Sequence, residues 1–162
     1  MRNQALRVLC LLLAVGTATA QTQSGGTPSR ARVDPPTQSE SADLAALRKK
    51  ADAGDAKAQF NLGLKYASGE GVEKDAVLAV SWYRMAADQG NPQAQYNLGD
   101  MYDRGDGVEK DAVQAFSWYR KAADRGHAKA QFKLGIMYHS GDGVEEESIQ
   151  AVSWYRKAAD QG

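Results

Sequence analysis

The sequence predicts an all-α protein: a solenoid of three helix-turn-helix repeats preceded by an N-terminal capping helix. A 36-residue pattern recurs three times, and 18 of its 36 positions hold the same residue in every unit. A fixed period of this length is typical of stacked helical repeats. Within each unit, two stretches with apolar residues every three or four positions are separated by glycines, which indicates two helices per unit.

The three units are expected at residues 55–90, 91–126 and 127–162, and each helix should have one apolar face. On the first helix this face is formed by Ala58, Leu62, Gly63 and Tyr66 and by their equivalents in the later units. On the second helix it is formed by Ala79, Trp82, Tyr83, Ala86 and Ala87 and by their equivalents. Because small residues face large ones, the two helices should approach each other closely.

The expected helix ends carry residues that start and stop helices. Asp75 and Asp111 stand where second helices need N-caps, and Asn91 precedes a first helix that has Pro92 at its first position. Gly90 falls at the C′ position after a second helix. Glycine pairs separate the two helices of each unit: Gly69 and Gly71, Gly105 and Gly107, Gly141 and Gly143. Each unit is therefore predicted to be a closed helical hairpin.

Two segments lie between the N-terminal twenty residues and the repeats. Residues 41–54 look like half a unit, because Arg48 and Ala51 fall in register with Arg84 and Ala87. We interpret them as the N-terminal capping helix. Residues 21–40 are mostly Gln, Thr, Ser, Gly and Pro without a periodic apolar face, which predicts a disordered tether.

The first twenty residues have the three parts of a secretory signal peptide. Arg2 and Arg7 form a basic start, residues 8–15 form an apolar core too short to span a bilayer, and residues 18–20 form a small-residue cleavage site. Lipidation at Cys10 is the alternative, although the residues before it are not small. We therefore expect an exported protein, periplasmic or secreted, with no stable membrane insertion after signal cleavage.

Composition narrows the classes of partner. Without residues 1–20, the chain has 18 basic and 20 acidic side chains. This balance gives no electrostatic reason to expect nucleic acid or anionic lipid as a partner. Cys10 is the one cysteine of the sequence, so the exported form would hold its fold by packing, without disulfides.

The repeat motifs resemble two known families. Leu-Gly-x-x-Tyr followed by Ala-x-x-x-Tyr is similar to the tetratricopeptide signature, although the period here is 36 residues. The loop Gly-x-Gly-Val, followed by Asp-x-x-x-Ala-x-x-Trp-Tyr-Arg-x-Ala-Ala-Asp-x-Gly, resembles the Sel-one-like repeat family over residues 55–162. This resemblance implies a right-handed α/α superhelix.

The same resemblance implies a function class without naming an activity. Sel-one-like repeat proteins serve as adaptors in signalling, envelope assembly, membrane-protein quality control or host contact. Some exported relatives are rich in cysteine, with a disulfide in each repeat, and are linked to β-lactam binding. The repeats of this chain contain no cysteine, so that association is not carried over. We expect a protein-interaction module and no enzyme.

No established catalytic or metal-binding motif is found in the sequence. Ser81 and its equivalents recur in every unit, as a structural residue would. His127 and His139 are too few for a zinc site. A turn explains the glycines after Asp103, so they do not indicate a calcium loop. We expect no cofactor and no metal. The rival hypotheses are a cell-wall hydrolase, with candidates among His127, His139, Asp103 and Lys133, and a purely structural spacer.

A partner is expected along the first helices, at positions that differ between units and lie off the packing face. The candidate residues are Phe60, Leu64, Tyr96, Asp100, Asp103, Phe132, Ile136 and His139. They suggest an aromatic ladder with apolar ends and an acidic centre, suited to a peptide or protein with apolar anchors around a basic residue. The alternative is that the ladder is buried between adjacent first helices.

The last second helix suggests another contact surface. No polar capping helix follows it in the sequence, and terminal repeats usually need one. Ala151, Trp154, Tyr155 and Ala158 are therefore expected to be only partly covered. We interpret this end as a site of homodimerisation or partner docking.

Overall fold

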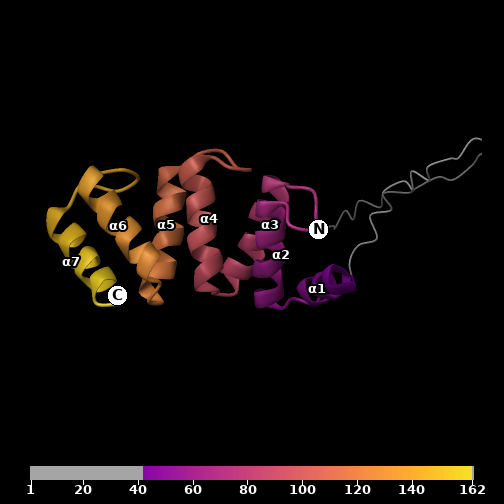
Figure 1. The fold of residues 1–162 in the computed structure, drawn as a ribbon. Coiled ribbons are helices and arrows are strands. Elements are labelled where there is room, and N and C mark those ends of the chain that lie inside the picture. Colours follow the sequence, from indigo (N-terminus) through magenta and orange to yellow (C-terminus); the bar gives the residue numbers. More distant parts are fainter. Residues whose placement is uncertain (1–41, 162) are drawn as a thin grey trace, which may run out of the picture. The chain divides into compact units, whose positions relative to one another are not determined.

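A computed structural model of the chain describes residues 42–161 (Figure 1). The predicted signal peptide and tether, residues 1–20 and 21–40, lie outside this range. The described part contains seven helices and no strand: α1 (Ala42–Asp52), α2 (Ala56–Ser68), α3 (Ala76–Asp88), α4 (Pro92–Arg104), α5 (Ala112–Asp124), α6 (Ala128–Ser140) and α7 (Ser148–Ala159). The predicted all-α solenoid is confirmed. None of these helices is long and apolar enough to cross a membrane.

The helices pack in chain order, which is the arrangement of a solenoid. The pairs α2–α3, α4–α5 and α6–α7 form three hairpins, and α3 packs on α4 as α5 packs on α6. Helix α1 packs on α2 in the position of a second helix. Figure 1 shows the hairpins following one another along the chain. Because each hairpin contacts mainly its neighbours, stability is expected to build up from repeat to repeat.

Side-chain caps start five of the six repeat helices. The N–H of Leu78 donates to the Asp75 carboxylate at 2.9 Å, and that of Ala94 donates to the Asn91 side chain at 3.0 Å. These caps, with those from Asp55, Asp111 and His127, satisfy N–H groups that a first turn leaves unpaired. Helix α7 follows Glu147, which makes no such bond.

Two close approaches require glycine. A Cβ atom on Gly99 would lie 2.8 Å from the Tyr119 ring, so this residue lets α4 and α5 approach. A Cβ atom on Gly107 would lie 2.3 Å from the Ala76 carbonyl oxygen, and its φ of +68° is unfavourable for other residues. Gly107 thereby allows the loop of one repeat to rest on the start of the preceding second helix.

Two series of side-chain hydrogen bonds join each hairpin to the preceding helix. The amide Nε2 of Gln95 donates to the Ala87 carbonyl at 3.0 Å. Gln59 and Gln131 make the same bond to Ala51 and Ala123. All three glutamines are buried. The apolar period of the sequence does not reveal their role, although their identity in every unit indicates that they belong to the scaffold.

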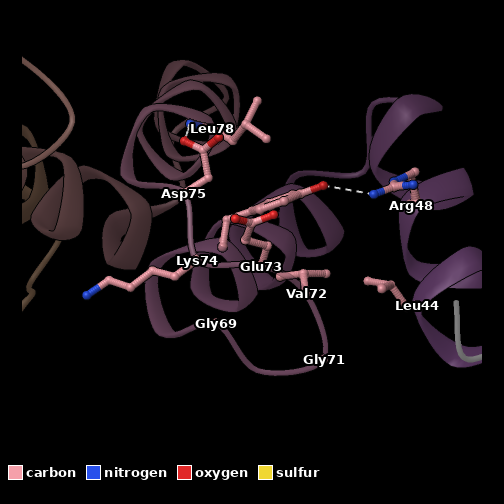
Figure 2. Close-up of a pocket in the computed structure, with 10 residues that line it drawn as sticks. Leu44, Arg48, Gly69, Gly71, Val72, Glu73, Lys74, Asp75 and Leu78 are labelled. Carbon is pink, nitrogen blue, oxygen red and sulfur yellow. Dashed lines mark hydrogen bonds between the residues drawn. The ribbon is translucent and has the colours of Figure 1, made fainter. Parts of the chain in front are cut away.

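The second series links an arginine on each of three second-type helices to a tyrosine on the next first helix. The Arg48 guanidinium donates to the Tyr66 hydroxyl at 2.8 Å (Figure 2). Arg84 donates to the Tyr102 hydroxyl, and Arg120 donates to that of Tyr138 at 3.3 Å. These bonds give a shared structural role to Arg48, Arg84 and Arg120 and to the tyrosines that recur on the first helices.

The tryptophans pack backward onto the preceding hairpin. Trp118 belongs to the buried cluster around Ala79 and Leu98, and Trp154 belongs to the cluster around Ala115 and Leu134. The prediction that Ala151 and Trp154 are only partly covered is therefore wrong, since they are 2% and 3% exposed. Tyr155 and Ala158 are half-buried, as predicted. An indole that packs backward is covered whether or not another repeat follows.

Candidate protein-binding face

The predicted binding residues lie on α2, α4 and α6, and we call this surface the first-helix face. Its members are Phe60 and Leu64 on α2, Tyr96, Asp100 and Asp103 on α4, and Phe132, Ile136 and His139 on α6. Leu64 and Ile136 are each 40% exposed, and Phe132 is 53% exposed. Three apolar side chains of this face are therefore accessible to a partner, two of them at equivalent positions of the repeat.

The rings of the aromatic ladder pack on tyrosines of the second helices and also leave part of their surface accessible. Phe60 and Tyr96 are half-buried, with their ring centroids 6.0 and 5.6 Å from those of Tyr83 and Tyr119. Phe132 packs on the equivalent Tyr155 at 5.6 Å and is nevertheless exposed. Each ring thus rests on the second helix of its own hairpin, and the accessible area increases on α6.

The next repeat also covers the ring of Tyr96. The His127 imidazole stacks on it with centroids 4.8 Å apart, while its Nδ1 accepts the N–H of Ala130 at 3.2 Å and caps α6. Burial, and then the nearby Lys129 ammonium, lower the pKa of His127 below its ordinary 6.5. A neutral imidazole keeps Nδ1 free to accept, which the cap requires.

The acidic centre of the first-helix face is held in ion pairs. The Lys133 Nζ lies 3.2 Å from an Asp103 carboxylate oxygen and 3.9 Å from one of Asp100. The Arg104 Nε lies 3.1 Å from Asp100. Lys133 belongs to the following repeat, so these contacts join α4 to α6. The sequence indicated the two acids but not their partners, because it does not give the direction of the Lys133 side chain.

A buried tyrosine hydroxyl lies beside this ion-pair network. Burial and the charges of Asp100 and Asp103 raise the pKa of Tyr119. Its hydroxyl is buried and has no hydrogen-bond partner among the described residues. At the equivalent place one repeat earlier, burial raises the pKa of Tyr83, and a hydrogen bond with the Asn97 side chain offsets part of the rise. Lys133 stands at the position of Asn97, which explains the difference.

A cleft of about 380 Å³ opens between the first and second hairpins. Its lining includes Ala67 on α2, Tyr83 on α3, and Asn97, Asp100 and Met101 on α4. One repeat later, Asp103 and Lys133 replace Ala67 and Asn97, and their ion pair spans the corresponding space. The first-helix face is therefore hollowed between α2 and α4 and bridged between α4 and α6.

A second cleft, of about 990 Å³, lies between α1 and the loop that joins α2 to α3 (Figure 2). Leu44 and Arg48 line it from α1, and Val72, Glu73 and Lys74 line it from the loop. The dashed line from the Arg48 guanidinium in Figure 2 marks the hydrogen bond that it donates to the Tyr66 hydroxyl. Acidic and basic groups are mixed in this cleft, so it selects no ligand charge.

The four residues of the hydrolase hypothesis do not form one site. Lys133 and Asp103 are paired with each other. His127 and His139 lie at opposite ends of the 13-residue α6, roughly 18 Å apart along the helix. Within residues 42–161, no group of three or more His, Cys, Asp and Glu is placed to hold a metal ion. These four residues are therefore not brought together as one catalytic constellation.

Stacked helical hairpins that repeat the same interhelical hydrogen bonds, with a first-helix face that differs between units, define an α/α repeat scaffold. The sequence matches the family model of the Sel1 repeat three times, over residues 56–91, 92–127 and 128–162. The chain therefore belongs to the Sel1 repeat family, which agrees with the resemblance to Sel-one-like repeats. Sel1 repeat proteins generally mediate protein–protein interaction, and the family is typically not enzymatic.

Solved structures support the family and the fold. A protective antigen of uropathogenic Escherichia coli strains, which displays an SLR fold, is 44% identical with a TM-score of 0.72, over 74% of this chain and 26% of the antigen. A Sel1 repeat protein from Oxalobacter formigenes is 48% identical with a TM-score of 0.69, over 74% of this chain and 90% of that protein.

A more distant structure is Helicobacter pylori cysteine rich protein B. It is 26% identical with a TM-score of 0.59, over 72% of this chain and 89% of that protein. No match is found among curated protein sequences. This chain thus spans about a quarter of the E. coli antigen's length, and any activity of that whole antigen does not transfer with the fold.

Proposed function

We propose that the chain is an exported protein-interaction module that binds a peptide or protein along its first-helix face. The observation that carries the proposal is the exposure of Leu64, Phe132 and Ile136 on the first helices of a Sel1 repeat scaffold. Exposed apolar side chains are the anchors by which helical surfaces hold peptides. A purely structural spacer would favour polar residues at these positions.

The ion pairs define the partner's chemistry further. Asp100 and Asp103 are partly buried and neutralised by Lys133 and Arg104. A basic residue of a partner would have to compete with these internal cations, so apolar anchors should contribute most of the affinity. Ion pairs that a partner makes with such partly buried groups should contribute mainly to the rate of association and to specificity.

Export is part of the same proposal. It rests on the predicted signal peptide, with cleavage after Ala20 and delivery to the periplasm or beyond the cell. Mass spectrometry of the protein purified from its own cells tests it directly. A mature chain that begins at Gln21 agrees with the proposal, whereas an intact N-terminus found only in the cytoplasm contradicts it.

Binding is tested after the partner has been identified by crosslinking in the cell envelope. Leu64→Glu with Ile136→Glu places two charges on the first-helix face, whereas Val77→Glu with Val113→Glu places two on second helices, where both valines are 62% exposed. The first pair should weaken binding about tenfold or more, or about 1.4 kcal/mol. The second pair should leave it unchanged. Equal effects from both pairs would contradict the proposed face.

Homodimerisation through the last hairpin, formed by α6 and α7, is a second candidate function. Ile149 and Val152 on α7 are 86% and 55% exposed, and Phe132 lies on the same hairpin. Burying such side chains against a second copy would remove them from water. Light scattering of the mature protein at tens of micromolar, a range of ordinary dimer affinities, decides this. A monomer at that concentration excludes the dimer.

A further inference from the structure

One hydrogen bond of the repeat scaffold is missing in the second unit. In the first unit, Gln89 follows α3, and its Nε2 donates to the Oε1 of the buried Gln59 at 2.7 Å. In the third unit, the Gln161 Nε2 donates to the Gln131 Oε1 at 2.6 Å. A buried glutamine is thus satisfied at both ends, since its own Nε2 donates to the preceding helix.

The second unit carries Arg125 at the position of Gln89 and Gln161. Gln95 is 3% exposed and still donates to Ala87, but its Oε1 is buried without a hydrogen-bond partner among the described residues. The Arg125 guanidinium instead lies over Gly90, where a Cβ atom would be only 2.8 Å from its Nη2. A buried acceptor without a donor is costly.

Gln95 is one of the residues that line a cleft of about 390 Å³. Gln95, Gly90, Trp118 and Arg125 contribute to its lining. Two aspartates and two basic side chains also line it, so their formal charges cancel: Asp88, Asp124, Lys121 and Arg125. The cleft therefore has no net formal charge that would require a charged ligand. Arg125 is exposed, so its movement can open the way to Gln95.

We propose that this cleft binds a carboxamide, the side chain of a glutamine or asparagine presented by a partner protein. The carboxamide N–H would donate to Gln95 Oε1, as Gln89 and Gln161 do in the neighbouring units. Its carbonyl oxygen would accept from the Arg125 guanidinium, whose donors are fixed in a planar fork. The same molecule thus displays the complementary group twice, at 2.6 and 2.7 Å. This site is separate from the first-helix face.

An NMR titration tests the proposal. The probe is N-acetyl-Ala-Gln-Ala-N-methylamide, added to the ¹⁵N-labelled protein up to about 20 mM, beyond a millimolar dissociation constant. A saturable shift of the Gln95 side-chain amide and the Trp118 indole N–H is expected. The matched control peptide carries methionine in place of glutamine. No saturable shift, or an equal shift with the methionine peptide, would overturn the proposal.

Two variants localise the effect, and each copies a residue that another unit carries at the same position. Arg125→Gln supplies the missing donor and should abolish the response at Gln95. Gln89→Arg removes a donor and should create a new response at Gln59. A response that persists unchanged in Arg125→Gln would also overturn the proposal. The variant Leu64→Glu with Ile136→Glu should bind the probe as the wild type does. Binding of the carboxamide is thereby tested separately from binding at the first-helix face.

Discussion

The two junctions between hairpins share one backbone design and differ in their side chains. Gly107 and Gly143 make the same close approach to the preceding second helix, since a Cβ atom on either glycine would lie 2.3 Å from a carbonyl oxygen of that helix. On the first-helix face, however, the first junction carries a cleft, whereas the Asp103–Lys133 pair spans the second. Identical residues thus keep the stacking constant, and the residues that differ give each junction its own surface.

The largest expected loss of stability comes from disturbing the close approach that both junctions share. Gly107→Ala places a methyl group against the Ala76 carbonyl and at a positive φ, which should lower the free energy of unfolding by about 3 kcal/mol. Gly71→Ala is the matched control, because its φ is also positive while no described atom lies within 4 Å of the new Cβ. It should cost about 1 kcal/mol. Urea denaturation measures both, and equal losses would refute the close approach.

A smaller effect should follow when the side chains of the second junction are moved to the first. Ala67→Asp with Asn97→Lys copies the Asp103–Lys133 pair onto α2 and α4. In a double-mutant cycle the two changes should stabilise each other by about 0.5–1 kcal/mol, the usual range for a partly exposed pair. Urea denaturation of the four proteins gives the coupling energy. A coupling near zero would show that the junctions differ in backbone as well.

The smallest expected effect concerns the cap at the start of the third hairpin. Burial lowers the pKa of His127 in the folded chain. The contribution of this histidine to the free energy of unfolding is therefore complete above about pH 6.5, and it is lost as pH falls through the lower folded-state pKa. Protonation removes the acceptor that caps α6. From about pH 7.5 to about pH 5, the wild type should lose about 0.5 kcal/mol more than His127→Asn, which caps as Asn91 does. Denaturation at both pH values measures this loss. An equal loss of stability in the wild type and in His127→Asn would contradict this assignment.

The fold could be predicted from the sequence because the repeat shows each helix three times. The start of α4 follows from Asn91 and Pro92, and the need for Gly99 follows from the large residue opposite it. The backward packing of Trp154 could not be predicted in this way, since an apolar period gives a face of the helix but not the neighbour that covers it. The same limit concealed the interhelical hydrogen bonds of Gln59.

The candidate site could be predicted only in part. Positions that vary between units are visible in the sequence, and Leu64 and Ile136 are indeed exposed. Whether Asp100 is free or paired depends on Lys133, which lies 33 positions later and reaches it only in the folded stack. Assigning the acidic centre therefore required three-dimensional contacts, because a charge pattern does not record which charges are neutralised.

The central claim is that the first-helix face receives the partner. Hydrogen–deuterium exchange of the mature protein, alone and saturated with the captured partner, tests it without any substitution. We expect protection in peptides that cover α2, α4 and α6, with little change along α3 and α5. Protection confined to α3, α5 and α7, with α2 and α4 unchanged, would contradict the account.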